Sequence, residues 1–259
     1  MSVVPSTSPN FKANVKEALA DEQLQNALAN IKNGFVRNRR IASERLAEFE
    51  ALRDQARDIK THTIEHLDVY LEIYQQNVEA SGGQVHWAMD EVEARKIILE
   101  ICQNADAKTV TKGKTMIGEE IGINEYLEEN GIEPIETDLG EYIIQLRGEM
   151  PSHIIAPATH VSKEQVADAF KETHTELDAD RSLEDADDLL AEARAMLRDK
   201  FIQADVGITG ANFLIAETGS SVIVTNEGNG DLTQTLPKVH IALASIEKVV
   251  PTLEDVTTL

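Results

Sequence analysis

Three things are scarce in this sequence: cysteine, basic residues and long apolar runs. Cys102 is the only cysteine among 259 residues, so the chain has no partner for an intramolecular disulfide. It also lacks the four thiolates that an iron–sulfur cluster usually needs. No apolar run approaches the roughly 18 residues of a membrane span, and the first residues do not form a charged segment followed by an apolar one. We therefore expect a cytoplasmic protein without a membrane span.

The charge balance disfavours nucleic-acid binding. The sequence has 24 basic and 46 acidic residues, a net charge of −22, which repels a phosphate backbone unless basic residues gather on one face. One basic cluster, KNGFVRNRR at 32–40, lies in a helical stretch and has Phe35 as its only aromatic residue. This composition favours a solvated helix face or a docking surface for an acidic partner over a nucleic-acid interface.

Apolar periodicity divides the chain into two parts. Residues 1–80 are expected to be an N-terminal helical segment, because apolar side chains recur there at three- and four-residue steps from residue 11 onward. In residues 81–259, short apolar strands alternate with helices, which predicts an α/β domain with a mostly parallel sheet and helices on both faces. The expected strands and helices are 85–88 with 90–104, 109–111 with 119–130, 132–137 with 138–147, and 153–157 with 162–173.

The last third of the chain has a different pattern. We expect an acidic helical region, an antiparallel hairpin and a further buried strand, at 176–203, 211–216 with 221–225, and 239–244. A hairpin turn centred on Thr218 and Gly219 would pair Leu214 with Ile223. Near the end, Thr252 followed by an aspartate three residues later is typical of a helix start.

Three short motifs resemble functional patterns, one of them completely, but none is convincing in its context. HTIEH, His62–His66, matches a zinc-peptidase pattern, but its helix is amphipathic and no further metal ligand is evident. GNGDLT at 228–233 lacks the third glycine of a dinucleotide fingerprint, and we expect it to follow the hairpin without opening a helix. DADRSL at 178–183 lacks the glycine and the bidentate glutamate of a calcium loop. We therefore expect no metal site, and we expect Cys102 to be a buried structural thiol.

A pair of lysines follows one of the predicted strands. KGKT at 112–115 resembles the end of a phosphate-binding loop, but position 108 is a lysine where that loop needs glycine. Lys112 and Lys114 nevertheless lie at the carboxyl edge, where open α/β sheets bind ligands. The residues leave open whether these lysines bind an anion or are only exposed to solvent.

Several segments, taken in order, resemble the lactate-utilisation protein B family and its LUD domain. The resemblance runs from about residue 15 to the end of the chain. The segments that carry it are THTIEHLDVYL, VHWA, KGKTMIGEEIGINEYLEENGIEPIETDLGEYIIQL, PSHIIAPATH, GITGANFLIAETGSSVIVTNEGN and LPKVHIALASIEKVVPTLED.

The resemblance implies a bacterial cytoplasmic protein that works with other lactate-utilisation subunits to oxidise L-lactate to pyruvate and pass electrons onward. It also implies a fold similar to that of phosphosugar isomerases and CoA transferases. In the family, a ferredoxin-like region with clustered cysteines follows the LUD domain and carries 4Fe–4S clusters. This sequence ends in the helix that would lead into that region. We therefore expect a fragment without a cofactor, which binds a ligand or docks a partner.

An alternative hypothesis is a small-molecule enzyme that acts on an acyl-CoA or a phosphorylated ligand. Glu217, at the hairpin turn, would then be a carboxylate nucleophile, whereas the simpler interpretation is a polar turn residue. A third hypothesis is a purely structural subunit. We expect a small anionic ligand to bind at the lysines or at one end of the hairpin. These candidate residues are Lys112 and Lys114; Thr209, Gly210, Asn212, Asn226 and Glu227 at the open end; and Thr218, Gly219 and Ser220 at the tip.

Overall fold

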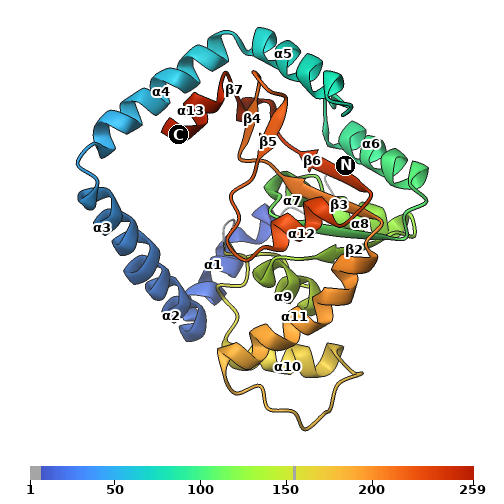
Figure 1. The fold of residues 1–259 in the computed structure, drawn as a ribbon. Coiled ribbons are helices and arrows are strands. Elements are labelled where there is room, and N and C mark those ends of the chain that lie inside the picture. The colour runs from blue at the N-terminus through green and yellow to red at the C-terminus, as the bar shows by residue number, and fades with distance from the viewer. Residues whose placement is uncertain (1–6, 154–155) are drawn as a thin grey trace.

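The computed structural model describes residues 7–153 and 156–259, and its centre is a four-stranded parallel sheet (Figure 1). The strand order is β2-β1-β3-β6. The strands are β1 (Thr109–Gly113), β2 (Glu133–Glu136), β3 (Val206–Gly210) and β6 (Val239–Leu243). In the register of this sheet, Lys112 lies between Glu136 of β2 and Ile208 of β3. The predicted α/β fold with a parallel sheet is confirmed.

Helices cover both faces of the sheet. One face packs against α6 (Glu91–Asn104), α7 (Met116–Glu120) and α8 (Ile123–Glu129). The other packs against α9 (Leu139–Arg147), α11 (Ala186–Gln203) and α12 (Asn229–Thr235), with α10 (Lys163–Thr173) against α9 and α11. Because both faces are covered, residues of β1 and β3 are buried in succession instead of alternating between core and solvent.

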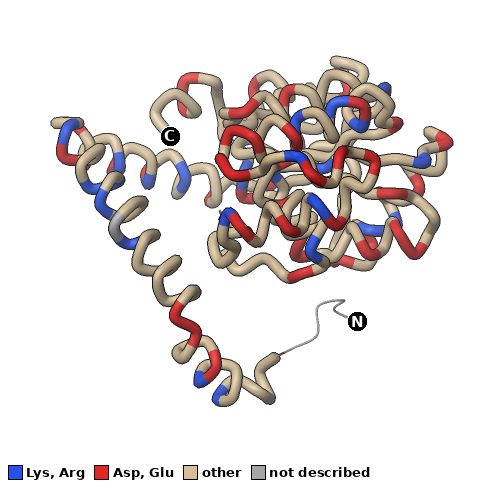
Figure 2. Tube along the Cα trace, turned by 90° about the horizontal axis from the view of Figure 1, so that it is seen from below, with Lys and Arg blue, Asp and Glu red and all other residues tan. Residues whose placement is uncertain are grey.

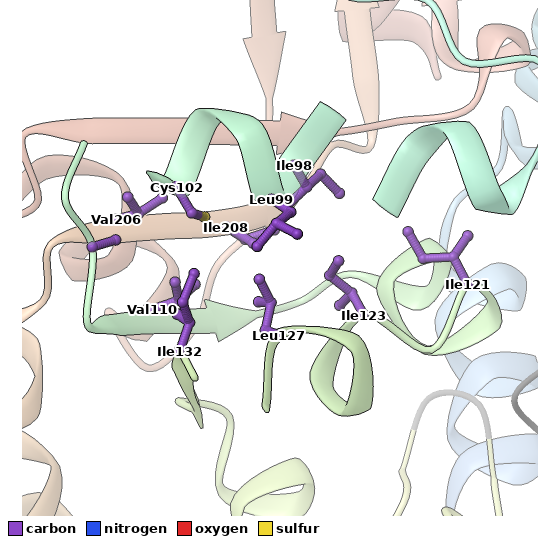
Figure 3. Packing of buried hydrophobic residues seen from close by; sticks show 11 residues of the cluster. Ile98, Leu99, Cys102, Val110, Ile121, Ile123, Leu127, Ile132, Val206 and Ile208 are labelled. Atoms are coloured by element: carbon purple, nitrogen blue, oxygen red, sulfur yellow. The ribbon is translucent and has the colours of Figure 1, made fainter. Parts of the chain in front are cut away.

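The main apolar core lies between the sheet and α6 to α8 (Figure 3). Val110 and Ile208 of the strands contribute to the same buried cluster as Ile98 of α6 and Leu127 of α8. Burying a side chain of this size contributes roughly 1.5–3 kcal/mol relative to leaving it exposed. Cys102 belongs to this core, and burial raises the pKa of its thiol to about 11. The prediction of a buried thiol at this position is confirmed.

A smaller sheet, of order β5-β4-β7, stands beside the main one. Its strands are β4 (Phe213–Ile215), β5 (Ser220–Val222) and β7 (Val249–Val250). The predicted antiparallel hairpin is confirmed, but its predicted register is wrong, because Leu214 pairs with Ser221. The loop comprises residues 216–219, and the backbone N–H of Gly219 closes it on the carbonyl of Ile215 at 2.9 Å. Gly219 has φ +67°, a left-handed conformation that favours glycine.

The N-terminal helices form an arm along one side of the α/β body (Figure 1). After a short 3₁₀ turn, η1 (Ser8–Asn10), the helical periodicity expected from residue 11 is confirmed. The helices are α1 (Phe11–Ala20), α2 (Glu22–Ile31), the π-helical η2 (Lys32–Val36), α3 (Arg37–Arg45), α4 (Phe49–Glu65) and α5 (Leu67–Ala80). Leu71 and Tyr74 of α5 pack on the small sheet at Leu214 and Val249. No helix among the described residues is both long enough and apolar enough to cross a membrane.

Charge is divided unevenly between arm and body. Residues 11–46 contain seven basic and four acidic side chains, whereas residues 47–259 contain 17 basic and 42 acidic ones. The Arg positions of α3 stand together on the arm, away from the acidic body (Figure 2). Residues 11–46 of the arm, from α1 to the end of α3, therefore carry an excess of positive charge in an otherwise acidic molecule.

The chain ends in two short helical pieces that join the arm to the small sheet. These are η3 (Ile246–Lys248) and α13 (Leu253–Thr258), and α13 packs on α4. The helix start expected at Thr252 is confirmed, because its side chain and that of Asp255 form a reciprocal capping box.

Some expected elements were wrong. Residues 85–88 form no strand, and Trp87 instead donates a hydrogen bond from Nε1 to Gln75 of α5 at 2.8 Å. Of the strand expected at 153–157, residues 154–155 lie outside the described residues, and the flanking ones form bends and turns. The helix expected at 119–130 is divided into α7 and α8 at Gly122, which has φ +61°.

Two further corrections concern the last third. Residues 176–185 are a loop and not part of a helix, because Arg181 folds this segment onto Glu192 of α11 through bonds of 2.6 and 2.7 Å. GNGDLT does open a helix, since α12 begins at Asn229. The expectation that no helix follows the hairpin was therefore wrong, and β7, only two residues long, was not expected at all.

Candidate functional site

The candidate site lies at the carboxyl edge of the parallel sheet, where β1 and β3 end side by side. From β1 the chain continues to β2 on one side, whereas β3 lies on the other side of β1. This reversal of strand order is the place where open α/β sheets bind ligands. Gly210 closes β3, and a Cβ at this position would lie 2.4 Å from the carbonyl oxygen of Lys114. The absence of a side chain therefore allows the ends of the two strands to approach closely.

Lys114 is the central side chain of this edge. Its backbone has φ +55°, a left-handed conformation that costs a non-glycine residue roughly 1–2 kcal/mol. Its Nζ lies 3.2 Å from each of three oxygens, Oδ2 of Asp138, Oδ1 of Asn226 and Oε2 of Glu227. Burial lowers the pKa of Lys114, but the bonds to Asp138 and Glu227 outweigh burial and raise it above its ordinary value. Lys114 is therefore a fixed ammonium group at neutral pH.

Backbone and side-chain contacts around this ammonium hold the edge together. Asn229, the first residue of α12, donates from Nδ2 to the carbonyl of Thr137 at 3.1 Å. Thr137 donates from Oγ1 to the carbonyl of Lys112 at 2.9 Å, which ties the end of β2 to β1. On β3, Oγ1 of Thr209 is 2.8 Å from Nε2 of His240, whose pKa is lowered by burial. These neutral contacts leave Lys114, with its acidic partners, as the charged part of the edge.

Lys112 has a different position from that of Lys114. Its side chain is 1% exposed, and it forms ion pairs with Glu119 of α7 and, at 2.8 Å, with Glu136 of β2. Oε1 of Glu136 also accepts a hydrogen bond from Nδ2 of Asn124 at 2.6 Å. Burial lowers the pKa of Lys112, yet the surrounding carboxylates, led by Glu136, raise it overall. Lys112 is thus a buried cation balanced from within the chain.

A third glutamate, Glu141, completes the buried group. It lies in the first turn of α9, three residues after Asp138. Burial raises the pKa of Glu141 to about 8, with a further contribution from the nearby charge of Glu136 and a smaller opposing one from Lys112. We call Lys112, Glu119, Glu136 and Glu141 the buried charge network.

The two ends of the hairpin have separate surroundings. At the open end, Asn226 and Glu227 meet Lys114, while Asn212 accepts a hydrogen bond from the backbone N–H of Val224 at 2.8 Å. Asn212 therefore holds the hairpin closed. The structure brings together Lys114, Asn226 and Glu227 by direct contact, and it places Thr209 and Gly210 in the adjoining strand.

The tip of the hairpin rests on the arm. Asn77 of α5 donates from Nδ2 to the carbonyls of Ala216 and Glu217, at 2.8 and 3.1 Å. The carboxylate of Glu217 accepts from the backbone N–H of Leu253 at 3.2 Å, at the start of α13. Thr218 donates from Oγ1 to Oγ of Ser220 at 2.9 Å. The four tip candidates, Glu217, Thr218, Gly219 and Ser220, are therefore grouped apart from the Lys114 contacts.

The sequence did not mark several residues of the edge. Glu119, Glu136, Asp138 and Glu141 lie in the same family-like segment as Lys114, residues 112–146, but no spacing within that segment singled them out as site residues. The one available signal was Asp138, which directly follows a predicted strand and is the first residue of a predicted helix, as a residue at a ligand-binding edge is. The structure also has two surface hollows. One, of about 260 Å³, lies between α9 and α10, and the other, of about 500 Å³, lies between α2 and residues 159–162. Neither is lined by the residues of the sheet edge described above.

The histidines of HTIEH interact with nearby residues of α4 and α5. Nε2 of His62 is 2.9 Å from the hydroxyl of Tyr70, and Nδ1 of His66 is 2.9 Å from the carbonyl of His62. In residues 7–153 and 156–259, no three His, Cys, Asp or Glu side chains are grouped as a metal site would require. An iron–sulfur cluster does not fit this chain either, because its one cysteine is a buried thiol within α6.

Comparison with known proteins gives consistent matches. The family model of the LUD domain matches residues 71–259. The chain is 43% identical over 250 residues to lactate utilization protein B of Bacillus pumilus, which covers 96% of this chain and 52% of the relative. It is 43% identical over 246 residues to lactate utilization protein B of Bacillus subtilis, which covers 95% and 50%. The chain thus spans about half the length of the curated relatives it matches. No solved structure matches it significantly.

Proposed function

The chain belongs to the LUD domain family, and on that basis we propose that it serves L-lactate utilisation by binding a small hydroxy acid or keto acid at Lys114. Two Bacillus relatives at 43% identity, both named lactate utilization protein B, support the pathway. The contacts of Lys114 support the ligand class. This proposal concerns the binding of the ligand.

The side chains around Lys114 suit a ligand with a carboxylate and a hydroxyl group. An ammonium forms charge-assisted hydrogen bonds to a carboxylate. Asp138 and Glu227 are acceptors only when ionised, so they would accept the hydrogen of a ligand hydroxyl. The three bonds of Lys114 measure 3.2 Å, at the long end of the usual range, so a better acceptor can replace one of them. The fixed ammonium between two acceptors is the observation that carries the proposal.

Binding is tested by isothermal titration calorimetry with L-lactate, pyruvate and acetate. We expect L-lactate to bind more tightly than acetate, which lacks the hydroxyl group. Replacing Lys114→Ala should weaken L-lactate binding about ten- to a hundredfold, because a hydrogen bond to a charged group contributes about 1.5–3 kcal/mol. Lys108→Ala, at the exposed amino end of the same strand, is the matched control. Equal binding by the wild type and Lys114→Ala would contradict the proposal.

A cellular experiment tests the role in lactate utilisation. Residues 1–259 would replace the matching half of the Bacillus subtilis relative, and growth would be measured with L-lactate as the sole carbon source. We expect the chimaera to support growth and the same chimaera with Lys114→Ala to grow poorly. A chimaera that accumulates in the cell to the level of the native protein but does not support growth would count against the role.

The structure gives no support to the acyl-transfer alternative. Glu217 already caps α13 through Leu253, and the adjacent backbone is held by Asn77. Incubation with acyl-CoA substrates followed by intact mass measurement tests this alternative directly. A covalent adduct that is absent from Glu217→Gln would favour it over simple ligand binding.

A further inference from the structure

The buried charge network contains more acid than base. Lys112 supplies one positive charge, while Glu119, Glu136 and Glu141 supply three carboxyl groups. Lys112 and Glu136 are 1% and 3% exposed at the side chain, so water does not screen them, whereas Glu119 is 32% exposed and its charge is partly screened. An unpaired carboxylate in such surroundings is strongly disfavoured, and buried acids usually take up a proton instead. The charge imbalance therefore calls for at least one bound proton.

The hydrogen bonds of Glu136 and Glu141 show which of their oxygen atoms lack a donor. Oε1 of Glu136 accepts from Asn124 and from Lys112, at 2.6 and 2.8 Å. Oε2 of Glu136 and Oε2 of Glu141 are both buried and, within the described part of the chain, have no hydrogen-bond partner. Both atoms are acceptors when the carboxyl groups are ionised. One proton placed between two carboxyl groups converts one of them into a donor, as in other acidic pairs.

The charged groups around Glu141 come from each neighbouring element. They are Lys112 of β1, Glu136 of β2, Glu119 of α7 and Asp138 before α9. Only Lys112 favours ionisation of Glu141, and its ammonium already pairs with Glu119 and Glu136. The pKa of Glu136 is also raised, by burial first, against the attraction of Lys112. Both carboxyl groups thus favour retention of a proton.

We propose that Glu136 and Glu141 share one proton at neutral pH and that loss of this proton weakens anion binding at Lys114. The second part rests on the proposed function, whereas the first does not. Asp138 connects the two places, because its carboxylate contacts Lys114 and its charge acts on Glu141. Release of the proton adds a negative charge beside Asp138, and that charge repels a bound carboxylate. The pair is therefore a proton site that regulates the ligand site.

Infrared spectroscopy of the wild-type protein tests the shared proton. A neutral carboxyl group has a C=O stretch that an ionised one lacks. We expect this band to persist at about pH 7, where ordinary carboxyl groups are ionised, and to disappear by about pH 9.5. The band should be absent at about pH 7 from Glu141→Gln, which keeps the size of the side chain, and present in Glu120→Gln, an exposed neighbour on α7. A wild type without the band at about pH 7 overturns the proposal.

Binding of L-lactate at two pH values tests the coupling. We expect wild-type affinity to fall at least about fivefold between about pH 6.5 and about pH 9, and Glu141→Gln to bind equally at both. Lys114 stays protonated over this range because its pKa is raised. A wild-type affinity that is equal at both pH values overturns the coupling. If L-lactate does not bind at any pH, the proposed function and the coupling both fail, while the infrared band still decides the shared proton.

Discussion

Lys112 and Lys114 are two positions apart in the chain, yet their side chains occupy different environments. Lys112 stays within β1, whose register directs it toward Glu136 and the helices on that face. Lys114 leaves the strand in a left-handed conformation and reaches residues near the end of the chain, Asn226 and Glu227. Lys112 thus neutralises acidic groups in the interior, whereas Lys114 remains partly accessible, with a side chain that is 17% exposed.

The largest effect should come from removing the buried cation. Lys112→Met leaves Glu136 and Glu119 without their counter-ion, and breaking a buried ion pair costs about 3–5 kcal/mol. The free energy of unfolding, measured with urea, should fall by that amount. Lys108→Met changes an exposed lysine just before the same strand and should leave stability nearly unchanged. A loss below about 1 kcal/mol in Lys112→Met would show that the two lysines are more alike than the structure indicates.

The second-largest effect should come from disturbing the close approach between the ends of β1 and β3. In Gly210→Ala the new methyl group would lie 2.4 Å from the carbonyl oxygen of Lys114 and 3.2 Å from Cα of Thr115. Relieving this overlap should cost about 1–3 kcal/mol of stability and should displace Lys114, which weakens L-lactate binding. Gly34→Ala is the control, because no atom lies within 4 Å of the position that its new methyl group would take. Unchanged stability and binding would show that the strand ends can separate without consequence.

The pH dependence of stability distinguishes the buried charge network from the groups around Lys114. The pKa of Glu141 is raised to about 8 from its ordinary value of 4.5, so between these two pH values the folded state binds more proton than the unfolded state. Stability therefore falls as pH rises through this window, and Glu141 accounts for about 2 kcal/mol between about pH 6 and pH 8. Thermal unfolding of Glu141→Gln should lack this part of the decline, whereas Glu120→Gln should retain it. Identical slopes in all three proteins would contradict this assignment.

The substitution Lys114→Gly should have a large effect on L-lactate binding and a small effect on stability. Glycine adopts φ +55° without strain, which returns about 1 kcal/mol and offsets the lost contacts with Asp138 and Glu227. We expect the free energy of unfolding to change by less than about 1 kcal/mol while L-lactate binding weakens about ten- to a hundredfold, as in Lys114→Ala. Calorimetry and urea unfolding on one preparation check both statements. A large loss of stability would mean that Lys114 is structural, as Lys112 is.

The smallest effect is expected at the hairpin tip. Glu217→Gln keeps an oxygen that can accept from the N–H of Leu253, so stability should change by no more than about 0.5 kcal/mol. L-lactate binding should stay the same, since the contacts of Lys114 involve the other end of the hairpin. Loss of binding in this variant would extend the ligand site beyond the surroundings of Lys114.

The sequence was informative where structure is local. Short apolar runs followed by helical periodicity predicted β1, β2 and α9 within a few residues, because each element is marked by neighbours in the chain. The segment 85–88 has the same apolar character but packs by way of Trp87 on α5, and no pattern in those four residues distinguishes that contact from a strand.

The site was only half predictable, for a physical reason. The sequence placed Lys112 and Lys114 at the end of a predicted strand, and this identified the carboxyl edge of the sheet as the site. Strand ends can be predicted because strands and helices alternate along the chain. The burial of Lys112 depends on acids that α7 and β2 bring to it, and these meet only in the folded chain. The register of the hairpin was wrong by two residues because the loop at Gly219 closes on Ile215, a detail set by backbone conformation.

Residues 11–46 of the arm make the molecule a permanent electric dipole. Their basic excess contrasts with residues 47–259, which contain 42 acidic and 17 basic side chains (Figure 2). Two such molecules repel when their acidic parts face each other and attract when residues 11–46 of one face the acidic part of the other, so at low ionic strength their encounters are oriented before any contact forms. Salt at about 0.15 M shortens the reach of this field to about 8 Å, which confines the orientation to the final approach.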